Sequence, residues 1–257
     1  MIEERTAAIV LRSRAHGESD KIVTFLTKDW GKVTGIAKGA KRSRRRFVNV
    51  LEPFTHVQLR FRPSRADDLA FIFGCDLVQS FRGPSQDLQR FALASYVCEL
   101  VDVMVSGREA GPEMYALLLD GLQAIEGMVA LSSSFLPAFE LFLLAHTGYA
   151  PHLTDCQQCG RAMLSSAGTW AFSPSLGGVL CPQCREDGGS LLMLSAETVQ
   201  FLGETRRTTI AAVLGSSAPP RVYKELRALA GNMLSRHLHR PLKSRAFLEQ
   251  AQVLDDA

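Results

Sequence analysis

Four of the six cysteines in this sequence occur as two Cys-x-x-Cys pairs. The first pair is Cys156 and Cys159, the second is Cys181 and Cys184, and 21 residues lie between the pairs. The thiolates of one such turn can bind a single metal ion, and two turns complete the tetrahedral shell of a structural Zn²⁺ site. The interval is slightly longer than usual for this class, which a loop tolerates. The cysteines therefore predict a zinc ribbon in a reduced, cytosolic protein.

Two other chemistries use the same residue types. A redox-active site needs one Cys-x-x-Cys pair, so two pairs at ribbon spacing disfavour it, and four thiolates leave a catalytic metal no open position for water. Zinc deaminases combine His-x-Glu with Pro-Cys-x-x-Cys. His16-Gly17-Glu18 matches the first half, but Leu180 rather than Pro precedes Cys181, and we interpret the match as coincidence. Cys75 and Cys98 lie in apolar surroundings and are expected to be buried thiols.

Residues 38–47, which read KGAKRSRRRF, concentrate positive charge. No Asp or Glu occurs between Asp29 and Glu52, so nothing in the local sequence compensates the repulsion between these charges. Residues 1–80 hold 15 Lys and Arg against 9 Asp and Glu, whereas the rest of the chain holds 14 against 17. A positive field confined to one end of a chain favours a polyanionic partner. The cations of the stretch are Lys38, Lys41, Arg42, Arg44, Arg45 and Arg46.

Nucleic acid is the polyanion that this stretch fits best. Arginines bind phosphates, and each neutralised phosphate releases counterions. Guanidinium groups also stack on unpaired bases, and Phe47 is a candidate stacking platform. Nothing in the stretch is typical of base-edge recognition, so binding without sequence preference is expected. A solvated loop, or a loop that contacts an acidic protein partner, would carry the same charges.

The first 80 residues have the pattern of a small β-barrel. In the fourth predicted strand, Val57, Leu59 and Phe61 alternate with polar residues, as in a half-buried strand. Five short strands in such a length favour an OB-fold, and the basic stretch falls between the third and fourth of them. The predicted strands cover residues 6–12, 21–27, 32–37, 56–62 and 69–78.

Helical patterns follow the barrel, at residues 88–105, 113–131, 135–147 and 220–240. Gly148 is expected to cap the third helix, and the alternation at residues 169–172 predicts a strand of the zinc ribbon. The expected fold class is α+β: a five-stranded OB-fold barrel and a central all-helical domain with an inserted zinc ribbon built on the four cysteines. The predicted divisions are 1–80 for the barrel, 81–150 and 188–257 for the helical domain, and 151–187 for the ribbon.

A second basic cluster, residues 236–245, ends the last predicted helix. Cations at a helix C-terminus are favoured by the macrodipole, which alone can account for this cluster. The chain contains no Gly-rich nucleotide-binding motif and no serine-hydrolase motif. It has no secretory signal and no apolar run near the ~20 residues that span a bilayer. We therefore expect a cytoplasmic protein.

Several short segments have an order and spacing typical of one protein family. Besides the four ribbon cysteines they are residues 8–11 (AIVL), 17–23 (GESDKIV), 26–33, 37–40 (AKGA), 51–54 (LEPF), 144–151, 177–178 and 240–245 (RPLKSR). With these segments the chain resembles the bacterial RecO family of recombination mediators over almost its full length.

The resemblance implies an OB-fold, a helical domain and a zinc ribbon in a DNA-repair protein. It further implies binding of single- and double-stranded DNA, annealing of complementary strands and, with RecR, loading of RecA onto strands covered by single-strand-binding protein (SSB). Members of the family also bind the acidic C-terminal tail of SSB. No bond is made or broken in these steps, so we expect a cytoplasmic, nucleoid-associated protein that is not an enzyme.

Three other functions can be compared with the residues themselves. A zinc-ribbon RNA-binding or transcription-associated protein would share the barrel, the ribbon and the basic stretch. A metal-dependent enzyme would need an open metal position, which four cysteines do not leave. A protein–protein scaffold would use the basic stretch against an acidic partner.

Overall fold

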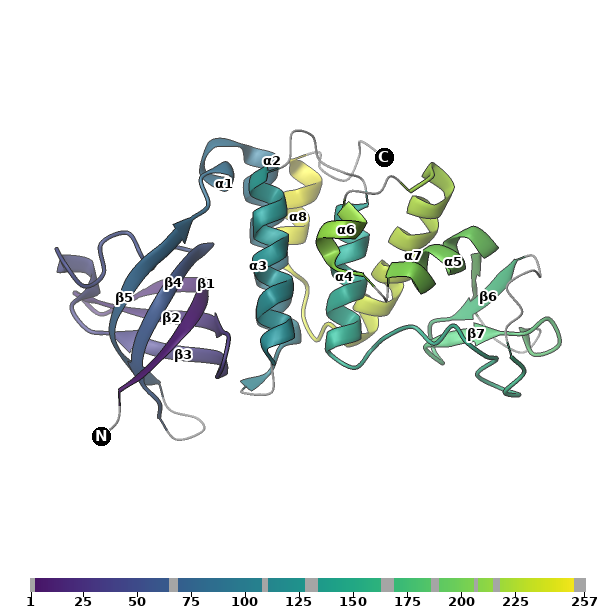
Figure 1. Cartoon of the computed structure of the whole chain (residues 1–257), viewed down its shortest axis with the longest axis horizontal. Coiled ribbons are helices and arrows are strands. Elements are labelled where there is room, and N and C mark those ends of the chain that lie inside the picture. The colour runs from purple at the N-terminus through teal and green to yellow at the C-terminus, as the bar shows by residue number, and fades with distance from the viewer. Residues whose placement is uncertain are drawn as a thin grey trace. The chain divides into compact units, whose positions relative to one another are not determined.

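The computed structural model describes residues 3–64, 69–107, 111–127, 134–162, 169–185, 190–205, 208–214 and 218–251. The chain packs as two compact units. The first comprises Met1–Gly127 together with Leu242–Asp255, and the second centres on Met128–Pro241. Both α and β elements are present, as the predicted α+β class requires (Figure 1).

Five strands of the first unit form a closed barrel (Figure 1). The order around the barrel is β1-β2-β3-β5-β4, and β4 pairs with β1 to complete the circle. Every pairing is antiparallel except the one between β3 and β5. The predicted five-stranded OB-like barrel is confirmed. Its strands are β1 (Glu4–His16), β2 (Asp20–Thr27), β3 (Gly31–Ala37), β4 (Thr55–Arg62) and β5 (Ala70–Ser80).

The interior of the barrel is filled by the alternate residues of each strand. In β4, Val57, Leu59 and Phe61 are buried, and the polar residues that alternate with them are partly exposed. Phe61 lies edge-on to Trp30 with the ring centroids 5.7 Å apart. This period of two is the signal that the sequence carried, because successive side chains of a strand point to opposite faces.

Gly35 permits the parallel pairing that closes the barrel. It pairs with Ala70 across the β3–β5 junction. A Cβ at position 35 would lie 2.8 Å from the Ala70 carbonyl oxygen and against the side chain of Ile72. Because Ala70 contributes backbone there, the neighbour cannot move aside cheaply, and closure depends on the missing side chain.

We therefore expect a Gly35→Ala substitution to lower the free energy of unfolding of the first unit by about 1–3 kcal/mol, the usual cost of overpacking. Urea unfolding followed by tryptophan fluorescence measures the loss, because Trp30 packs against the barrel core. Gly127→Ala is the control, since a Cβ at position 127 meets no atom within 4 Å. Equal effects of the two substitutions would contradict this role for Gly35.

In the described part of the first unit, four α-helices accompany the barrel: α1 (Gly83–Gln86), α2 (Leu88–Met104), α3 (Pro112–Gly127) and α8 (Lys243–Gln250). Asp87 caps α2 by accepting the Arg90 N–H at 2.8 Å. Glu126 accepts the Gly83 N–H at 2.6 Å, and Glu99 accepts the Ser244 N–H at 2.8 Å. Helix N-termini leave unpaired N–H groups with partial positive charge, so carboxylates stabilise them. Glu99 on α2 thus binds the start of α8, and Glu126 on α3 binds the start of α1.

Polar contacts join the barrel to these helices. The Tyr115 hydroxyl on α3 lies 2.6 Å from His56 Nε2 on β4, and both residues are buried. Lys32 on β3 donates to the Asp102 carbonyl oxygen of α2 at 2.6 Å and lies 3.5 Å from its carboxylate. The barrel and the helices that follow it in sequence therefore belong to one packed body.

The His56 contact predicts a pH dependence of stability. Burial lowers the pKa of His56 below its ordinary 6.5. The unfolded chain then binds a proton at this site more readily than the folded chain, so the folded state loses stability as the pH falls below about 6.5. A His56→Gln variant lacks this titration. We expect the wild type to melt at a higher temperature than the variant at about pH 7.5, and this difference in melting temperature to be smaller at about pH 5. A difference that does not change with pH would contradict the assignment.

The second unit combines helices with a small sheet. The strands are β6 (Trp170–Ser173), β7 (Gly178–Leu180) and β8 (Leu192–Leu194), in the order β7-β6-β8. Glu225 on α7 accepts the Ser195 N–H at 2.7 Å and the Thr198 hydroxyl at 2.6 Å, which fixes the start of α5. The helices are α4 (Phe135–His146), α5 (Ala196–Thr205), α6 (Ile210–Leu214) and α7 (Pro220–His237).

Some sequence expectations need correction. The short helices α1, α5, α6 and α8 and the strands β7 and β8 were not predicted. The predicted helix over 220–240 ends at His237. The basic cluster at 236–245 begins in the last turn of this helix, as expected, but its final residues continue into a further helix, α8. The macrodipole accounts for Arg236 and His237 in the last turn of α7, but Lys243 begins α8, where Glu99 compensates the positive end.

The predicted third helix and its cap are confirmed. Gly148, at φ 85°, donates to the Ala145 carbonyl at 3.2 Å, and Tyr149 donates to the Leu144 carbonyl at 2.7 Å. These two bonds form a Schellman motif. Residues 128–131 of the predicted helix over 113–131 lie outside the described residues. The division into 1–80, 81–150 with 188–257, and 151–187 stays a prediction.

Candidate metal centre and nucleic-acid interface

The four ribbon cysteines converge on one point of the second unit. The Sγ atoms of Cys156, Cys159, Cys181 and Cys184 all lie within 4.8 Å of one another, and those of Cys159 and Cys181 are 3.7 Å apart. A tetrahedral Zn²⁺ with Zn–S bonds of about 2.3 Å places its sulfurs about 3.8 Å from one another. The four side chains therefore fit around one tetrahedral metal ion.

Backbone N–H groups support the thiolate form that binds metal. The Cys181 N–H donates to Cys156 Sγ at 3.3 Å. Burial acts to raise the pKa of the Cys156 thiol, but N–H groups of Cys181, Cys159 and Gln158 outweigh it and lower the pKa to about 6. In contrast, sulfur neighbours led by Cys181 raise the pKa of Cys184 to about 12. Four sulfurs this close resist carrying four negative charges, and a divalent cation removes that repulsion.

Local backbone geometry aims the cysteines. Gly160, at φ 71°, follows the first pair and donates to the Cys156 carbonyl at 2.8 Å, which closes the first turn. The Cys184 N–H donates to the Cys181 carbonyl at 3.0 Å, which closes the second. Around the sulfurs the apolar packing is slight, with Leu180 buried and Leu191 partly buried.

Metal removal tests this centre. We expect a Cys156→Ser, Cys159→Ser double variant to lose its metal and the local structure around β6 and β7, because binding energy in such sites is folding energy. Metal content by mass spectrometry and proteolysis of the region measure both effects. Cys98→Ala is the matched control, since Cys98 is a buried thiol whose pKa burial raises. A double variant that keeps stoichiometric metal would contradict the assignment.

His16 and Glu18, the other half of the deaminase pattern, belong to no metal-binding group among the described residues. Both are exposed at the turn between β1 and β2. Cys75 and Cys98 are buried, as expected, and desolvation raises the pKa of both thiols. Among the described residues, neither pattern forms a further metal-binding group.

The basic stretch lies in the connection between β3 and β4, as predicted. Among the described residues, Arg42, Arg44 and Arg45 have no ion-pair partner, whereas Lys38 lies 3.6 Å from the Asp20 carboxylate. Lys41 donates to the Gly17 carbonyl at 2.8 Å. All the cations of the stretch are exposed: Lys38, Lys41, Arg42, Arg44, Arg45 and Arg46.

Apolar side chains anchor this connection to the barrel. Phe47, Val50 and Leu51 are buried in the barrel core. Phe47 is 5% exposed, so it cannot serve as a platform for bases, and that expectation is wrong. Its burial follows from the fold, because the ring packs against the apolar residues that fill a small barrel. The guanidinium of Arg46 lies 5.1 Å from the centre of the same ring.

Asp20 fixes the start of the connection. Its carboxylate accepts the Gly39 N–H at 2.8 Å and the Ser19 hydroxyl at 3.0 Å. The Gly39 bond, opposed by desolvation and supported by Ser19 and Lys38, lowers the pKa of Asp20. The Lys41 N–H also donates to the Ser19 carbonyl at 2.8 Å. The connection therefore lies against the β1–β2 turn, at a loop where OB-folds bind oligonucleotides.

Family comparisons agree with this architecture. The model described as "Recombination protein O N terminal" matches residues 1–81, and "Recombination protein O C terminal" matches residues 85–246. The chain belongs to the RecO family. A protein named DNA repair protein RecO from Symbiobacterium thermophilum is 38% identical over 247 residues, which cover 94% of each chain. One of that name from Nocardioides sp. is 37% identical over 248 residues, covering 96% of this chain and 99% of the relative.

This RecO-family chain therefore combines the barrel, the helices and the cysteine cluster in one sequence. Within the part of the chain that the structure describes, no helix has the length and apolar character needed to cross a membrane.

The residues that sequence reasoning missed are the apolar anchors around Phe47. The concentration of apolar residues at 47–51 (FVNVL), directly after the cations, was the available signal for them.

Proposed function

We propose that this chain binds single- and double-stranded DNA without sequence preference and anneals complementary strands during DNA repair and recombination. The observation that carries the proposal is the anchored basic connection, which presents exposed cations beside the β1–β2 turn of the barrel. Membership of a family whose relatives are named DNA repair proteins supports it. The arginines contact phosphates, which carry no base identity.

Annealing follows from charge screening. Two DNA strands repel each other through their phosphates, and this repulsion opposes the meeting of complementary bases. Cations that neutralise one backbone while leaving its bases free lower that barrier. The anchored connection suits this task because its position is fixed by Phe47 and Asp20 while its guanidinium groups stay in solvent. The step makes and breaks no covalent bond, so the proposed activity needs no catalytic residue.

The test replaces Arg42, Arg44 and Arg45 with Gln. We expect weaker binding of single-stranded DNA and a salt dependence, as log K against log salt, that is flatter by up to about 2, since each lost contact removes about 0.7. Annealing of complementary oligonucleotides should slow in parallel. The anchors are untouched, so the melting temperature of the barrel should stay unchanged.

Matched controls separate the site from net charge. Lys28 is exposed in the turn before β3, whereas Lys38 follows β3, so the two lie at opposite ends of that strand. Lys28→Gln should leave the slope nearly unchanged, and Arg44→Gln should change it by about 0.7. An unchanged slope in the triple variant would remove the connection from the interface. Tighter binding of RNA than of DNA by the wild type would favour the RNA-binding alternative.

The metal is proposed to be structural Zn²⁺ held by the four ribbon cysteines. The spacing of the sulfurs and the all-thiolate set, which leaves a tetrahedral ion no open position, support this choice. The ion would hold the two Cys-x-x-Cys turns together at a point where few apolar side chains of the described residues surround the sulfurs. Within the proposed division, residues 1–80 carry the DNA-binding loop and residues 151–187 carry the metal.

Partner proteins are proposed from the family resemblance. RecR would act with this chain in loading RecA onto SSB-coated single strands, at the nucleoid. The acidic tail of SSB would need an apolar pocket as well as cations. A pocket of about 230 Å³ in the second unit, lined by Leu141, Phe142, Phe201 and Leu226 among others, is large enough for an apolar side chain.

A further inference from the structure

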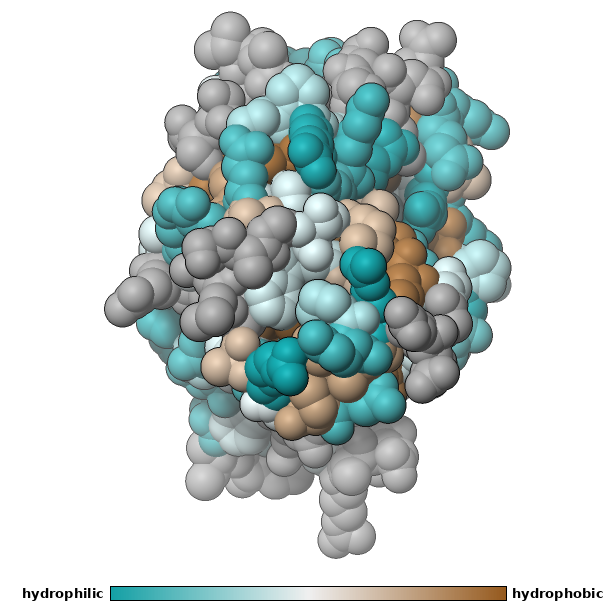
Figure 2. All heavy atoms as spheres, turned by 90° about the vertical axis from the view of Figure 1, so that its right-hand side faces the viewer, coloured by the Kyte–Doolittle hydropathy of each residue, from teal (hydrophilic) through white to brown (hydrophobic). Residues whose placement is uncertain are grey.

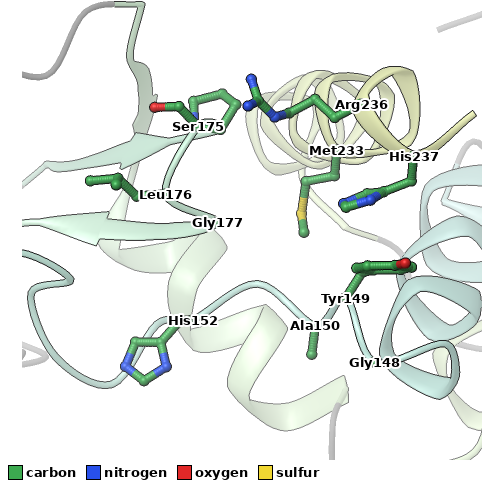
Figure 3. A pocket seen from close by; sticks show the side chains of 11 residues that line it. Gly148, Tyr149, Ala150, His152, Ser175, Leu176, Gly177, Met233, Arg236 and His237 are labelled. Carbon is green, nitrogen blue, oxygen red and sulfur yellow. The ribbon is translucent and has the colours of Figure 1, made fainter.

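A second cleft of the second unit combines aromatic, apolar and cationic side chains (Figure 3). Its volume is about 680 Å³, within the usual range of ligand sites. One wall is the turn between β6 and β7, residues 174–177. The other consists of the chain after α4 and the last turn of α7. The function proposed above uses none of these residues.

A stacked aromatic pair forms part of the second wall. The rings of Tyr149 and His237 lie 3.7 Å apart between centroids with 24° between their planes. The Schellman motif at Gly148 fixes the backbone of Tyr149, and α7 fixes that of His237. Despite the stacking, 43% of Tyr149 is exposed to solvent. An aromatic ring held rigidly and left accessible is a platform on which a further flat ring can stack.

The charge at this cleft is positive. Arg236 is exposed, and Figure 3 shows it extending from α7 toward the turn that carries Ser175. None of the described residues that line the cleft is Asp or Glu. His152 lies at its edge and is paired with Asp155, Nε2 to Oδ2, at 3.0 Å. Burial, together with the nearby charges of Arg236 and His239, lowers the pKa of His237, so its ring is neutral at neutral pH.

The ribbon supplies the opposite wall. Gly177 accepts the His152 N–H and Val179 donates to the His152 carbonyl, at 2.9 and 3.0 Å, so the turn is tied to the chain after Tyr149. Leu176 in this turn is 51% exposed, and Figure 3 shows Met233 projecting into the space between the turn and α7. Aromatic and apolar surfaces with one guanidinium beside them match a nucleotide, which has a flat ring and one phosphate.

We propose that this cleft binds one nucleotide of single-stranded DNA, with the base stacked on the Tyr149–His237 pair and the adjoining phosphate on Arg236. The inference rests on the proposed DNA-binding function and adds a second contact in the second unit. Duplex DNA does not fit this description, since its bases are stacked on each other and unavailable to Tyr149. The cleft is therefore selective for unpaired strands.

An acidic peptide is the competing occupant, and the lining disfavours it. A peptide anchored by an apolar side chain needs an enclosed apolar pocket, and the 230 Å³ pocket beside Leu141 offers one. Here the wall is a stacked aromatic pair with a polar edge. On the face that Figure 2 shows, hydrophilic and apolar residues are intermixed. The cleft thus resembles a stacking platform in a cationic groove.

Binding to matched single-stranded and duplex oligonucleotides tests the proposal. We expect Tyr149→Ala to weaken single-strand binding by roughly five- to a hundred-fold, the range for loss of one base–aromatic stack, and to leave duplex binding unchanged. Tyr149→Phe keeps the ring and should bind as the wild type does. A single strand carrying 5-iododeoxyuridine should cross-link to Tyr149 under ultraviolet light, as mapped by mass spectrometry.

Charge and folding have their own controls. Arg236→Ala should weaken single-strand binding, while Lys224→Ala, an exposed cation on α7 about 18 Å earlier along the helix, should not. Metal content and melting temperature show that each variant is folded.

Two results would overturn the inference while the proposed function stands. One is equal binding by Tyr149→Ala and Tyr149→Phe when Arg42, Arg44 and Arg45 variants still lose affinity. The other is a competition result, in which an acidic peptide prevents the cross-linking of Tyr149 at concentrations at which a competing single strand does not. If the wild type binds no DNA at low salt, the proposed function itself fails.

Discussion

The connection between β3 and β4 in the first unit is subject to one constraint: its like charges must lie close together and stay exposed to solvent. The connection between β3 and β4 carries cations that repel one another, yet Phe47, Val50 and Leu51 lie within the barrel core and keep it in place. Burying an aliphatic or aromatic side chain contributes about 1.5–3 kcal/mol, whereas repulsion between exposed charges in water is about 1 kcal/mol or less per pair and is screened by salt. Apolar anchoring therefore exceeds the repulsion, and the charges remain available to a polyanion.

Carboxylates fix the positions of several helices. Glu99, Glu126 and Glu225 each accept N–H groups at the start of a helix or a loop distant in sequence. Each bond satisfies a donor that the helix leaves unpaired and places negative charge at the positive end of the helix. These three contacts link α2 to α8, α3 to α1, and α7 to α5. They give short helices of low intrinsic stability a defined position.

The ribbon has a further form of stabilisation available to it. Its strands bury Phe172 and Val179, but among the described residues few apolar side chains besides Leu180 and Leu191 surround the four cysteines. A metal ion shared by four thiolates would cross-link the two Cys-x-x-Cys turns, and its binding energy would add to the stability that packing of the strands provides. The same ribbon positions the turn at residues 174–177 beside Tyr149. Metal binding and the proposed nucleotide cleft are in this way connected through one sheet.

The sequence by itself determined the features that depend on local spacing. The two Cys-x-x-Cys pairs indicated one metal centre, the period of two in β4 indicated a barrel strand, and Gly148 indicated a helix end. Each signal lies within a few residues, because strand pleat and helix pitch repeat at that scale. The barrel strand and the helix cap are confirmed, and the four sulfurs lie close enough together to hold one metal ion.

Only the tertiary structure decided what neighbours each residue has. Phe47 follows three arginines in sequence and resembles an exposed platform, but barrel closure places it in the core. Tyr149 and His237 are far apart in sequence. Their rings stack because the C-terminal ends of α4 and α7 lie close together. Lys243 begins a helix that the sequence did not indicate, and its N–H donates to Glu99 at 3.3 Å. Contacts between distant residues follow from which elements pack together, and a single sequence holds no periodic signal for them.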